Sequence, residues 1–349
     1  MNNPIYYNVH NRFKWNGLHL SKEDLCYNAS SLIKEGTDFE KDTGNFLLDW
    51  FDEKPFIELT TSGTTGAPKS IQIKKQAMVI SALSTGDFFN LKIGDKALHC
   101  LSTKYIAGKM MLVRGLILGL EMDFVAPSSN PLLNNVTDYD FVAMVPLQVQ
   151  NSISELKKVE KLIIGGAKIN ESLRIELSKL PTQVYETYGM TETITHIAAK
   201  KIGERAFSIL PNVTISQDER QCLVIDAPRI SNEKVVTNDL VELVSKNQFV
   251  LLGRIDNVIN SGGVKLIPEQ IEEKLSGKIL TRFFVTGIPD DALGEKLILV
   301  IESVKQAFDE TIFKVLNKYE KPKEIRFVPK FKETESGKVM RKETINSFL

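Results

Sequence analysis

Apolar and polar positions follow two different periods through the first half of the chain. Short apolar runs predict strands over residues 55–60, 70–73, 97–101, 122–126, 141–145, 162–164 and 183–185. Helical periodicity predicts helices over residues 74–89, 108–118, 146–157 and 170–180, the first of them amphipathic. This alternation favours a mostly parallel sheet covered by helices, in which ligands bind beyond the C-terminal ends of the strands.

The pattern changes on both sides of this region. Before it, Ser21 is predicted to cap a helix that runs to Lys34, with Asp24 at the third helical position. After it, residues 212–252 show short strands without helices between them, which predicts a small antiparallel sheet or barrel. Pro268 is expected to open a helix in a final α+β unit. The expected fold class is therefore α/β: a large domain of parallel and mixed sheets with helices and a small antiparallel β subdomain, then a small α+β domain.

The composition is typical of a soluble globular protein with about two domains. The chain has 349 residues, and its 44 acidic and 44 basic residues argue against a basic nucleic-acid-binding surface. Its three cysteines and four histidines are scattered, so neither a disulfide framework nor a histidine-built metal site is expected. The first residues lack a signal-peptide pattern, and the most apolar run is too short to span a bilayer. We expect a cytoplasmic protein without membrane insertion.

The segment 59–71 carries the densest candidate chemistry. It reads Leu-Thr-Thr-Ser-Gly-Thr-Thr-Gly-Ala-Pro-Lys-Ser-Ile and is predicted to be a loop between two strands. Glycines let the backbone approach a ligand, and successive N–H groups, hydroxyls and a lysine can surround a polyphosphate. It is not a Walker loop, because Pro68 stands where that motif has its second glycine. The simpler interpretation is a flexible surface loop rich in small polar residues.

Further motifs follow this loop along the chain. They are Tyr188-Gly189-Met190-Thr191-Glu192, Thr237-Asn238-Asp239-Leu240, Gly253-Arg254-Ile255-Asp256 followed by Ser261-Gly262-Gly263-Val264-Lys265, and Gly337-Lys338 with Arg341 beyond it. Together with the loop, over about residues 59–341, they resemble the adenylate-forming superfamily of acyl- and aryl-CoA ligases, peptide-synthetase adenylation domains and firefly luciferase. Asn238 replaces a glycine of the family pattern. One such motif would be weak evidence, whereas the ordered set is strong.

The resemblance implies a reaction in two halves, with ATP, Mg²⁺ and CoA. A carboxylate attacks the α-phosphorus of ATP to give acyl-AMP and pyrophosphate, and a thiol, usually that of CoA, then displaces AMP. Lys338 would stabilise charge at the α-phosphate, Glu192 would bind Mg²⁺, and Thr191 beside it would belong to the catalytic set. On the simpler interpretations, Lys338 is one lysine of a lysine-rich tail and Glu192 is an acid that caps a helix.

The same resemblance implies where the nucleotide binds. Its phosphates would lie against loop residues Thr61, Ser62, Gly63, Thr64, Thr65, Gly66 and Lys69. Adenine would stack on Tyr188, next to Gly189, and the opposite wall would be formed by Gly165, Gly166 and Ala167. Asp239 would accept hydrogen bonds from the ribose hydroxyls, and Arg254 would support the ribose or a phosphate.

The resemblance further implies two domains that move. Residues 1–254 would form the AMP-binding domain, and residues 257–349 would rotate about a hinge near Asp256 between the half-reactions. Gly262 and Gly263 would then line the tunnel for the pantetheine arm of CoA. The resemblance is compatible with a homodimer.

The sequence departs from the family pattern in two places. Family members usually carry roughly a hundred more residues before the phosphate loop, so the acyl pocket or a dimer surface is expected to differ. Tyr105 stands where many members have a histidine, so the role of that histidine does not carry over.

The run from Tyr188 to Ala198 is most similar to the o-succinylbenzoate–CoA ligases of menaquinone biosynthesis. Their acid has an aromatic ring and two carboxylates, which favours an amphipathic pocket containing a cation or hydrogen-bond donors. The candidates are Lys104, Lys109, Arg114, Thr195 and His196. Another aryl- or acyl-CoA ligase, or a stand-alone adenylation domain that loads a carrier-protein thiol, stays an alternative. A non-catalytic nucleotide-binding protein is disfavoured by the intact set of Glu192, Asp239 and Lys338.

Overall fold

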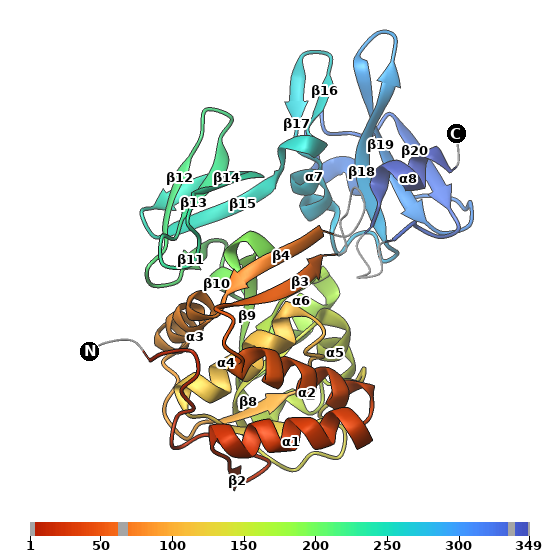
Figure 1. Cartoon of the computed structure of the whole chain (residues 1–349). Helices are drawn as coiled ribbons and strands as arrows, with labels where there is room; N and C mark the ends of the chain where they lie inside the picture. Colours follow the sequence, from red (N-terminus) through yellow and green to blue (C-terminus); the bar gives the residue numbers. More distant parts are fainter. Residues whose placement is uncertain (1–3, 62–68, 334–338, 348–349) are drawn as a thin grey trace. The chain divides into compact units, whose positions relative to one another are not determined.

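The computed structural model describes residues 4–61, 69–333 and 339–347 of the chain (Figure 1). The chain divides into two compact units. The first comprises residues 1–169, 173–214 and 225–235, and the second comprises residues 170–172, 215–224 and 236–349. The predicted boundary near Asp256 lies inside the second unit, so the hinge stays a prediction.

A mixed sheet organises the first unit. Its strands lie in the order β2-β1-β6-β5-β7-β8-β9-β10-β11. Their bounds are β1 Lys14–Trp15, β2 Leu18–His19, β5 Lys96–His99, β6 Glu121–Phe124, β7 Tyr139–Met144, β8 Val159–Ile164, β9 Gln183–Gly189, β10 His196–Lys201 and β11 Phe207–Ile209. Neighbours from β1 to β9 pair in parallel, whereas β2, β10 and β11 pair antiparallel. The predicted α/β class with a mostly parallel sheet is confirmed.

The helices differ from their prediction mainly in burial and length. Their bounds are α1 Lys22–Glu35, α2 Asp38–Phe51, α3 Lys75–Phe89, α4 Ile106–Leu118, α5 Pro146–Asn151 and α6 Glu171–Leu177. The expectation of an amphipathic helix over residues 74–89 is wrong, because α3 is buried along most of its length and packs against α4. The helix predicted over 146–157 is also too long, since α5 ends at Asn151 and a 3₁₀ turn covers Leu156–Lys158.

Helices α1 and α2 form an antiparallel hairpin (Figure 1). The predicted cap of α1 is confirmed: the Ser21 hydroxyl accepts a hydrogen bond from the Asp24 N–H, at 3.1 Å. A matching pair, Thr37 and Glu40, begins α2. That second pair follows the same sequence rule, so α2 could have been predicted from it.

Strands β3 (Phe56–Thr61) and β4 (Lys69–Lys74) form a two-stranded antiparallel hairpin around the predicted phosphate loop. The last pair in their register is Thr61 with Lys69, so both ends of the loop are held together by the ladder. The two predicted strands are therefore confirmed. Ser62, Gly63, Thr64, Thr65 and Gly66 lie outside the described residues, and their proposed contacts stay predictions.

The second unit contains antiparallel strands followed by an α+β arrangement. The bounds are β12 Thr214–Gln217, β13 Cys222–Asp226, β14 Val235–Ser245, β15 Gln248–Arg254, β16 Ile259–Ser261, β17 Val264–Leu266, α7 Pro268–Leu275, β18 Phe283–Asp290, β19 Gly294–Glu302, β20 Glu324–Val328 and α8 Arg341–Asn346. Strands β12 to β15 are neighbours in chain order, and β17-β16-β19-β18 form a separate sheet in which β20 pairs with β19. Pro268 opens α7 as predicted.

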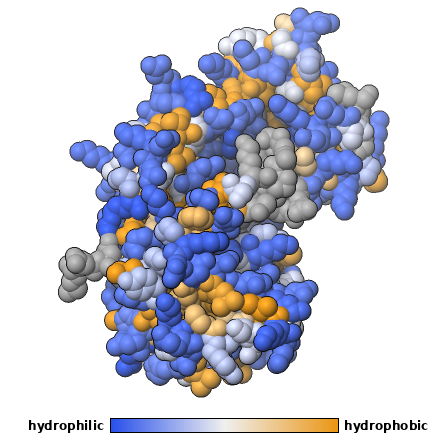
Figure 2. All heavy atoms as spheres, in the orientation of Figure 1, coloured by the Kyte–Doolittle hydropathy of each residue, from blue (hydrophilic) through white to orange (hydrophobic). Residues whose placement is uncertain are grey.

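Hydrophilic side chains dominate the face of the molecule in Figure 2, with smaller hydrophobic areas between them. Within the described ranges, no helix is long and apolar enough to cross a bilayer. The apolar side chains instead gather in separate cores. The largest lies around α3 and α4 in the first unit, and another packs α7 against the sheet of β16 to β19.

Candidate active site

The candidate nucleotide site lies at the C-terminal ends of β7, β8 and β9. Ile164 pairs with Met144 on one side and with Glu186 on the other, so these strand ends are adjacent. The Thr187 hydroxyl donates to the Ile164 carbonyl at 3.0 Å, and a Cβ placed on Gly165 would lie 2.9 Å from that hydroxyl. Parallel pairing thus brings the predicted Gly165–Ala167 loop beside the predicted Tyr188 motif. A glycine is required next in this loop, since Gly166 has φ of +86°.

Tyr188 is buried near the end of β9 rather than presented as an open platform. Its side chain is 9% exposed, and its ring lies 5.9 Å from that of Phe207, measured between centroids. One face or edge of the ring is therefore already in contact with the protein. Stacking of adenine on Tyr188 stays a prediction.

The loop after β9 has unusually close backbone packing. A Cβ on Gly189 would lie 2.3 Å from the Thr195 carbonyl oxygen, so only glycine fits there. Thr191–Thr193 forms a 3₁₀ turn. Thr193 is fully buried, and its hydroxyl accepts from the Met190 N–H at 3.1 Å. Thr193 organises this loop, and the sequence reasoning missed it.

Glu192 is exposed on this turn, with Thr191 half-buried before it. Outside residues 1–3, 62–68, 334–338 and 348–349, no cluster of three or more His, Cys, Asp or Glu side chains could hold a metal by itself. Mg²⁺ in nucleotide sites commonly takes one or two carboxylates and completes its shell with phosphates and water. A single exposed carboxylate at a predicted polyphosphate site fits that donor set.

A polar cluster, called here the Arg114 cluster, consists of the buried Arg114, Thr85 and His196 and the half-buried Thr195. Arg114 lies on α4 and Thr85 on α3, while Thr195 and His196 follow the Glu192 turn. Arg114 Nη2 lies 3.5 Å from Thr195 Oγ1, and His196 Nε2 lies 3.3 Å from Thr85 Oγ1. Three of the five predicted acid-pocket residues are therefore brought together.

Arg114 is a buried cation without a counter-ion among the described residues. It is 2% exposed, and within the described ranges its side chain contacts the Thr195 hydroxyl while its Nε is buried without a hydrogen bond. Burial lowers the pKa of Arg114 to about 10, so it stays protonated at neutral pH. Burial, and secondarily the charge of Arg114, hold the pKa of His196 well below its usual range. The cluster thus carries one positive charge and several hydrogen-bonding groups.

The remaining acid-pocket candidates lie elsewhere on α4 or before it. Lys104 and Tyr105 are exposed, and Tyr105 precedes the first residue of α4. Lys109 is buried, with its ammonium group 4.6 Å from the centre of the Phe46 ring. Burial lowers the pKa of Lys109, although nearby carboxylates oppose that shift. Lys109 therefore has a packing role that the sequence did not indicate.

In the second unit, Asp239 and Arg254 occupy paired positions on β14 and β15. Arg254 Nη1 lies 3.6 Å from Asp239 Oδ1, and Arg254 Nη2 donates to Asp256 Oδ2 at 2.8 Å. Asn238 donates to both Asp256 oxygens at 3.2 Å. The residue that departs from the family pattern therefore contacts the predicted hinge residue, and Arg254, Asp239 and Asp256 form one charged group.

Gly262 and Gly263 form the turn between β16 and β17. Ser261 pairs with Val264, and the two glycines between them have φ of +59° and +80°. A two-residue hairpin with positive φ at both positions is a type I′ turn, which strongly favours glycine. The turn alone explains why glycine stands at both positions, so a role in a pantetheine tunnel stays a prediction.

Gly337 and Lys338 lie outside the described residues. Arg341, three positions further on, has a structural role in the C-terminal sheet region. It donates to the Val285 carbonyl at 3.0 Å and to Glu272 Oε2 at 3.0 Å. These bonds fix the start of α8 against β18 and α7, next to the predicted catalytic lysine in the sequence.

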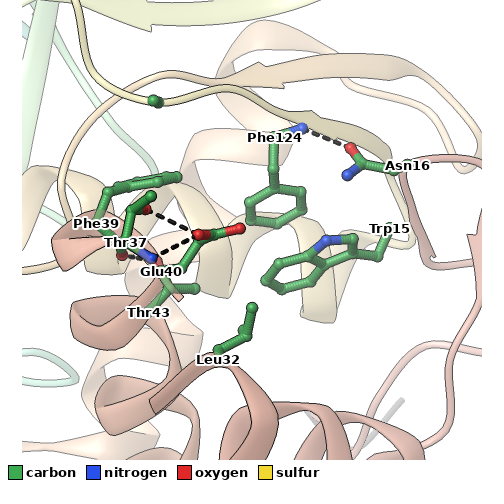
Figure 3. A pocket seen from close by; sticks show the side chains of 9 residues that line it. Trp15, Asn16, Leu32, Thr37, Phe39, Glu40, Thr43 and Phe124 are labelled. Carbon is green, nitrogen blue, oxygen red and sulfur yellow. Dashed lines mark hydrogen bonds between the residues drawn. The ribbon is translucent and has the colours of Figure 1, made fainter. Parts of the chain in front are cut away.

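A cavity of about 210 Å³ lies between the α1–α2 hairpin and the sheet of the first unit (Figure 3). Trp15 and Phe124 stack in parallel at its wall, with 3.5 Å between ring centroids. The Glu40 carboxylate also faces it, but one of its oxygens accepts two hydrogen bonds from Thr37. The Glu40 carboxylate at the wall of this cavity therefore serves to cap the start of α2.

The mostly parallel sheet and the loops at its C-terminal edge are the α/β arrangement that the resemblance to the adenylate-forming class implies. The chain belongs to the family of AMP-binding enzymes, whose sequence profile matches residues 43–229. That range contains the phosphate-loop segment, the Tyr188 motif and the Arg114 cluster. The predicted resemblance is thereby confirmed.

Relatives of known sequence include 2-succinylbenzoate–CoA ligases. The protein of Haemophilus influenzae is 24% identical over 306 residues, covering 80% of this chain and 65% of that protein. The protein of Salmonella typhimurium is 24% identical over 289 residues, covering 77% of this chain and 63% of that protein. This chain thus spans slightly less than two thirds of their lengths.

Two solved structures place the fold in the same class. A Dyadobacter fermentans protein described as acyl-CoA synthetase (AMP-forming)/AMP-acid ligase II-like is 37% identical, with 91% of this chain and 97% of that chain covered and a TM-score of 0.62. The Bacillus subtilis o-succinylbenzoate CoA synthetase, in complex with the intermediate OSB-AMP, is 20% identical and has a TM-score of 0.71 over 82% of this chain and 68% of that one. The second likeness concerns the fold alone.

Proposed function

We propose that this chain is an ATP-dependent acid–CoA ligase and that its acid is o-succinylbenzoate, a step of menaquinone biosynthesis. The observation that carries the proposal is the buried cation of Arg114, which lacks a carboxylate partner among the residues that the structure describes. A buried charge is costly unless it is paired. An acid with a second, unreacting carboxylate would supply that partner. The 2-succinylbenzoate–CoA ligases among the relatives support the same choice.

The chemistry would proceed in two displacements. A carboxylate oxygen of the acid attacks the α-phosphorus of ATP, the bond to the bridging oxygen breaks, and pyrophosphate leaves. The CoA thiolate, after loss of its proton, then attacks the carbonyl carbon, and AMP leaves with the electrons of the acyl–oxygen bond. Such phosphoryl chemistry depends on positioning and charge neutralisation.

The residues would divide these tasks between them. The loop from Thr61 to Lys69 would hold the phosphates, Glu192 would hold Mg²⁺, and the ion would neutralise phosphate charge when bound. Thr191 would stand beside Glu192 in the catalytic set. Asp239 and Arg254 would bind the ribose, and Lys338 would act at the α-phosphate. The exposed Glu192 and the half-buried Asp239 support these roles.

A panel of acids tests the proposal. Purified protein would be incubated with ATP, Mg²⁺, CoA and either o-succinylbenzoate, benzoate, 2-acylbenzoates without the second carboxylate, or fatty acids, and thioester and AMP would be quantified. We expect o-succinylbenzoate to be preferred by at least about a hundredfold in kcat/KM, since a charged pair inside the pocket is worth a few kcal/mol. Preferred turnover of a monocarboxylic acid would contradict the assignment.

The panel also separates the alternative thiols. Adenylation measured by pyrophosphate exchange reports the first half-reaction without CoA. If o-succinylbenzoate is adenylated but CoA does not accept the acyl group, a carrier-protein thiol becomes the acceptor. Adenylation of none of the acids would overturn the proposed function as a whole. The cytoplasmic location belongs to the same proposal, because ATP and CoA are cytoplasmic co-substrates.

A further inference from the structure

A strained turn joins the predicted Mg²⁺ ligand to the Arg114 cluster. Its central residue is Ile194, with φ of +67° and ψ of −57°. The Thr195 N–H donates to the Thr193 carbonyl, two residues back, at 2.7 Å. These values match the rare γ-turn with positive φ, whose centre is near φ of about +75° and ψ of about −65°.

A β-branched residue is among the worst choices for this backbone conformation. The branched side chain clashes with its own backbone at positive φ, so such a residue stays there only when its surroundings force it. Here, two sets of contacts do so. The Ile194 side chain is 3% exposed and packs in the main core, and the buried Thr193 hydroxyl lies within 3.0 Å of both the Met190 and Thr195 carbonyls.

The turn decides which way the chain faces on each side of Ile194. Glu192, two residues before it, is exposed. Thr195 and His196, directly after it, face Arg114 and Thr85. An extended Ile194 would not let the backbone return to Gly189 as it does here, where His196 pairs with Gly189. The strained turn therefore separates the nucleotide side of the loop from the acid side.

We propose that Ile194 is a positioning residue for the acid substrate: its buried side chain anchors the γ-turn that holds the Thr195 hydroxyl against Arg114 and the His196 ring against Thr85. The proposal deepens the proposed function and rests on it for the identity of the acid. Ile194 itself touches no reacting atom in this scheme. Its effect reaches the substrate through Thr195 and His196.

Two substitutions distinguish anchoring of the turn from ordinary core packing. Ile194→Ala removes the anchor but keeps the strain, whereas Ile194→Gly removes both, because glycine adopts positive φ freely. We expect Ile194→Ala to raise the KM for the acid about tenfold with little change in the KM for ATP. We expect Ile194→Gly to restore the KM for the acid to within about threefold of the unmodified protein. The thermal midpoint of Ile194→Gly should exceed that of Ile194→Ala.

Ile197, three residues further on in β10, supplies a matched control. It is fully buried and is not among the residues with positive φ. At this position the Ile197→Gly variant should be less stable than the Ile197→Ala variant, which is the usual order. The proposal is overturned if Ile194→Gly is no more stable than Ile194→Ala, or if both variants keep the unmodified KM for the acid.

The two readouts separate failure of this proposal from failure of the function. The stability order needs no substrate, so it tests the turn even if no acid in the panel is adenylated. The KM comparison uses whichever acid the unmodified protein turns over best. Turnover of a different acid with the expected Ala and Gly pattern would keep the positioning role and reject o-succinylbenzoate.

Discussion

Two buried ionisable side chains, Arg114 and His99, each carry a free-energy cost of burial. Among the residues that the structure describes, the charged Arg114 has one long side-chain contact, to the Thr195 hydroxyl, whereas His99 is neutral and fully buried between Phe39 and Phe124. Both ring nitrogens of His99 lack a hydrogen bond within the described part of the chain. Burial therefore disfavours the charged form of each side chain in the folded protein. This cost can be measured for each residue.

Replacing Arg114 should separate stability from activity. Arg114→Met removes a buried charge at similar side-chain length, so we expect the free protein to gain about 1–3 kcal/mol in its free energy of unfolding. The same variant should lose most turnover of the acid. Chemical denaturation and the thioester assay measure the two effects. Arg12→Met, at an exposed arginine, should change stability by less than about 0.5 kcal/mol. A destabilised Arg114→Met would show that Arg114 serves the fold itself.

His99 predicts a loss of stability in acid. Burial lowers its pKa from 6.5 to about 3, so the unfolded chain binds more protons between these values and stability falls as pH drops below about 6.5. Near pH 5 the loss from this residue is about 2 kcal/mol. We expect His99→Leu to flatten the stability profile between about pH 6.5 and pH 4, measured by denaturation at each pH. Because burial also lowers the pKa of His196, part of the pH dependence of stability should remain in the His99→Leu variant. An unchanged profile would contradict the assignment to His99.

At the scale of elements, the sequence was most informative where local rules act alone. The capped start of α1, the proline start of α7, and the strands on both sides of the phosphate loop follow from residues close together in sequence. The burial of α3 does not. Its Lys75, Ser81 and Thr85 would suggest a solvated face, yet all three are buried, because α3 packs against α4 and contacts other segments distant along the chain, such as His196 beside Thr85.

An ion pair with one buried partner connects the end of α2 with the start of α3. Lys75 is fully buried, and its ammonium group lies 2.6 Å from Asp52 Oδ1, whereas Asp52 is 35% exposed. Asp52→Ala leaves an unpaired buried charge and should cost about 2–4 kcal/mol in the free energy of unfolding. Lys75→Met should cost less, since the remaining Asp52 can reach water. Glu53→Ala, at the exposed neighbour, is the control and should have little effect. Urea denaturation measures both losses in the free energy of unfolding. Equal losses for Asp52→Ala and Lys75→Met would contradict the expected difference between the two variants.

At the scale of the whole molecule, the prediction concerns the two half-reactions. Lys338→Ala should reduce adenylation by about 10²–10³-fold, because it removes one charge at the developing transition state. Thioester formation from supplied acyl-AMP should remain largely intact, since the C-terminal domain would present another surface in that step. Pyrophosphate exchange and a CoA-capture assay measure the two rates. Lys330→Ala, an exposed lysine of the same region, is the control. An equal loss in both halves would contradict the alternation of domains.

The candidate site could be predicted from the sequence only in part. Its motifs predict which residues bind the nucleotide, and the parallel pairing of β8 with β9 brings two of these motifs, Gly165–Ala167 and Tyr188–Glu192, to neighbouring strand ends. The role of Asn238 as a partner of Asp256 could not be predicted, because the side-chain contact joins positions 18 residues apart. Lys109 and Arg114 looked alike in sequence, but only Arg114 reaches the loop after β9.

The sequence by itself determined the family, the alternating α/β class and most strands and caps, since these depend on periodicity, turn chemistry and short motifs. Only the tertiary structure decided which of the candidate cations lies beside Thr195 and His196, and that Ile194 carries the strain of the turn between them. The physical reason is that charge burial and backbone strain arise from contacts between distant segments. The sequence around a basic residue or an isoleucine does not indicate whether such contacts form.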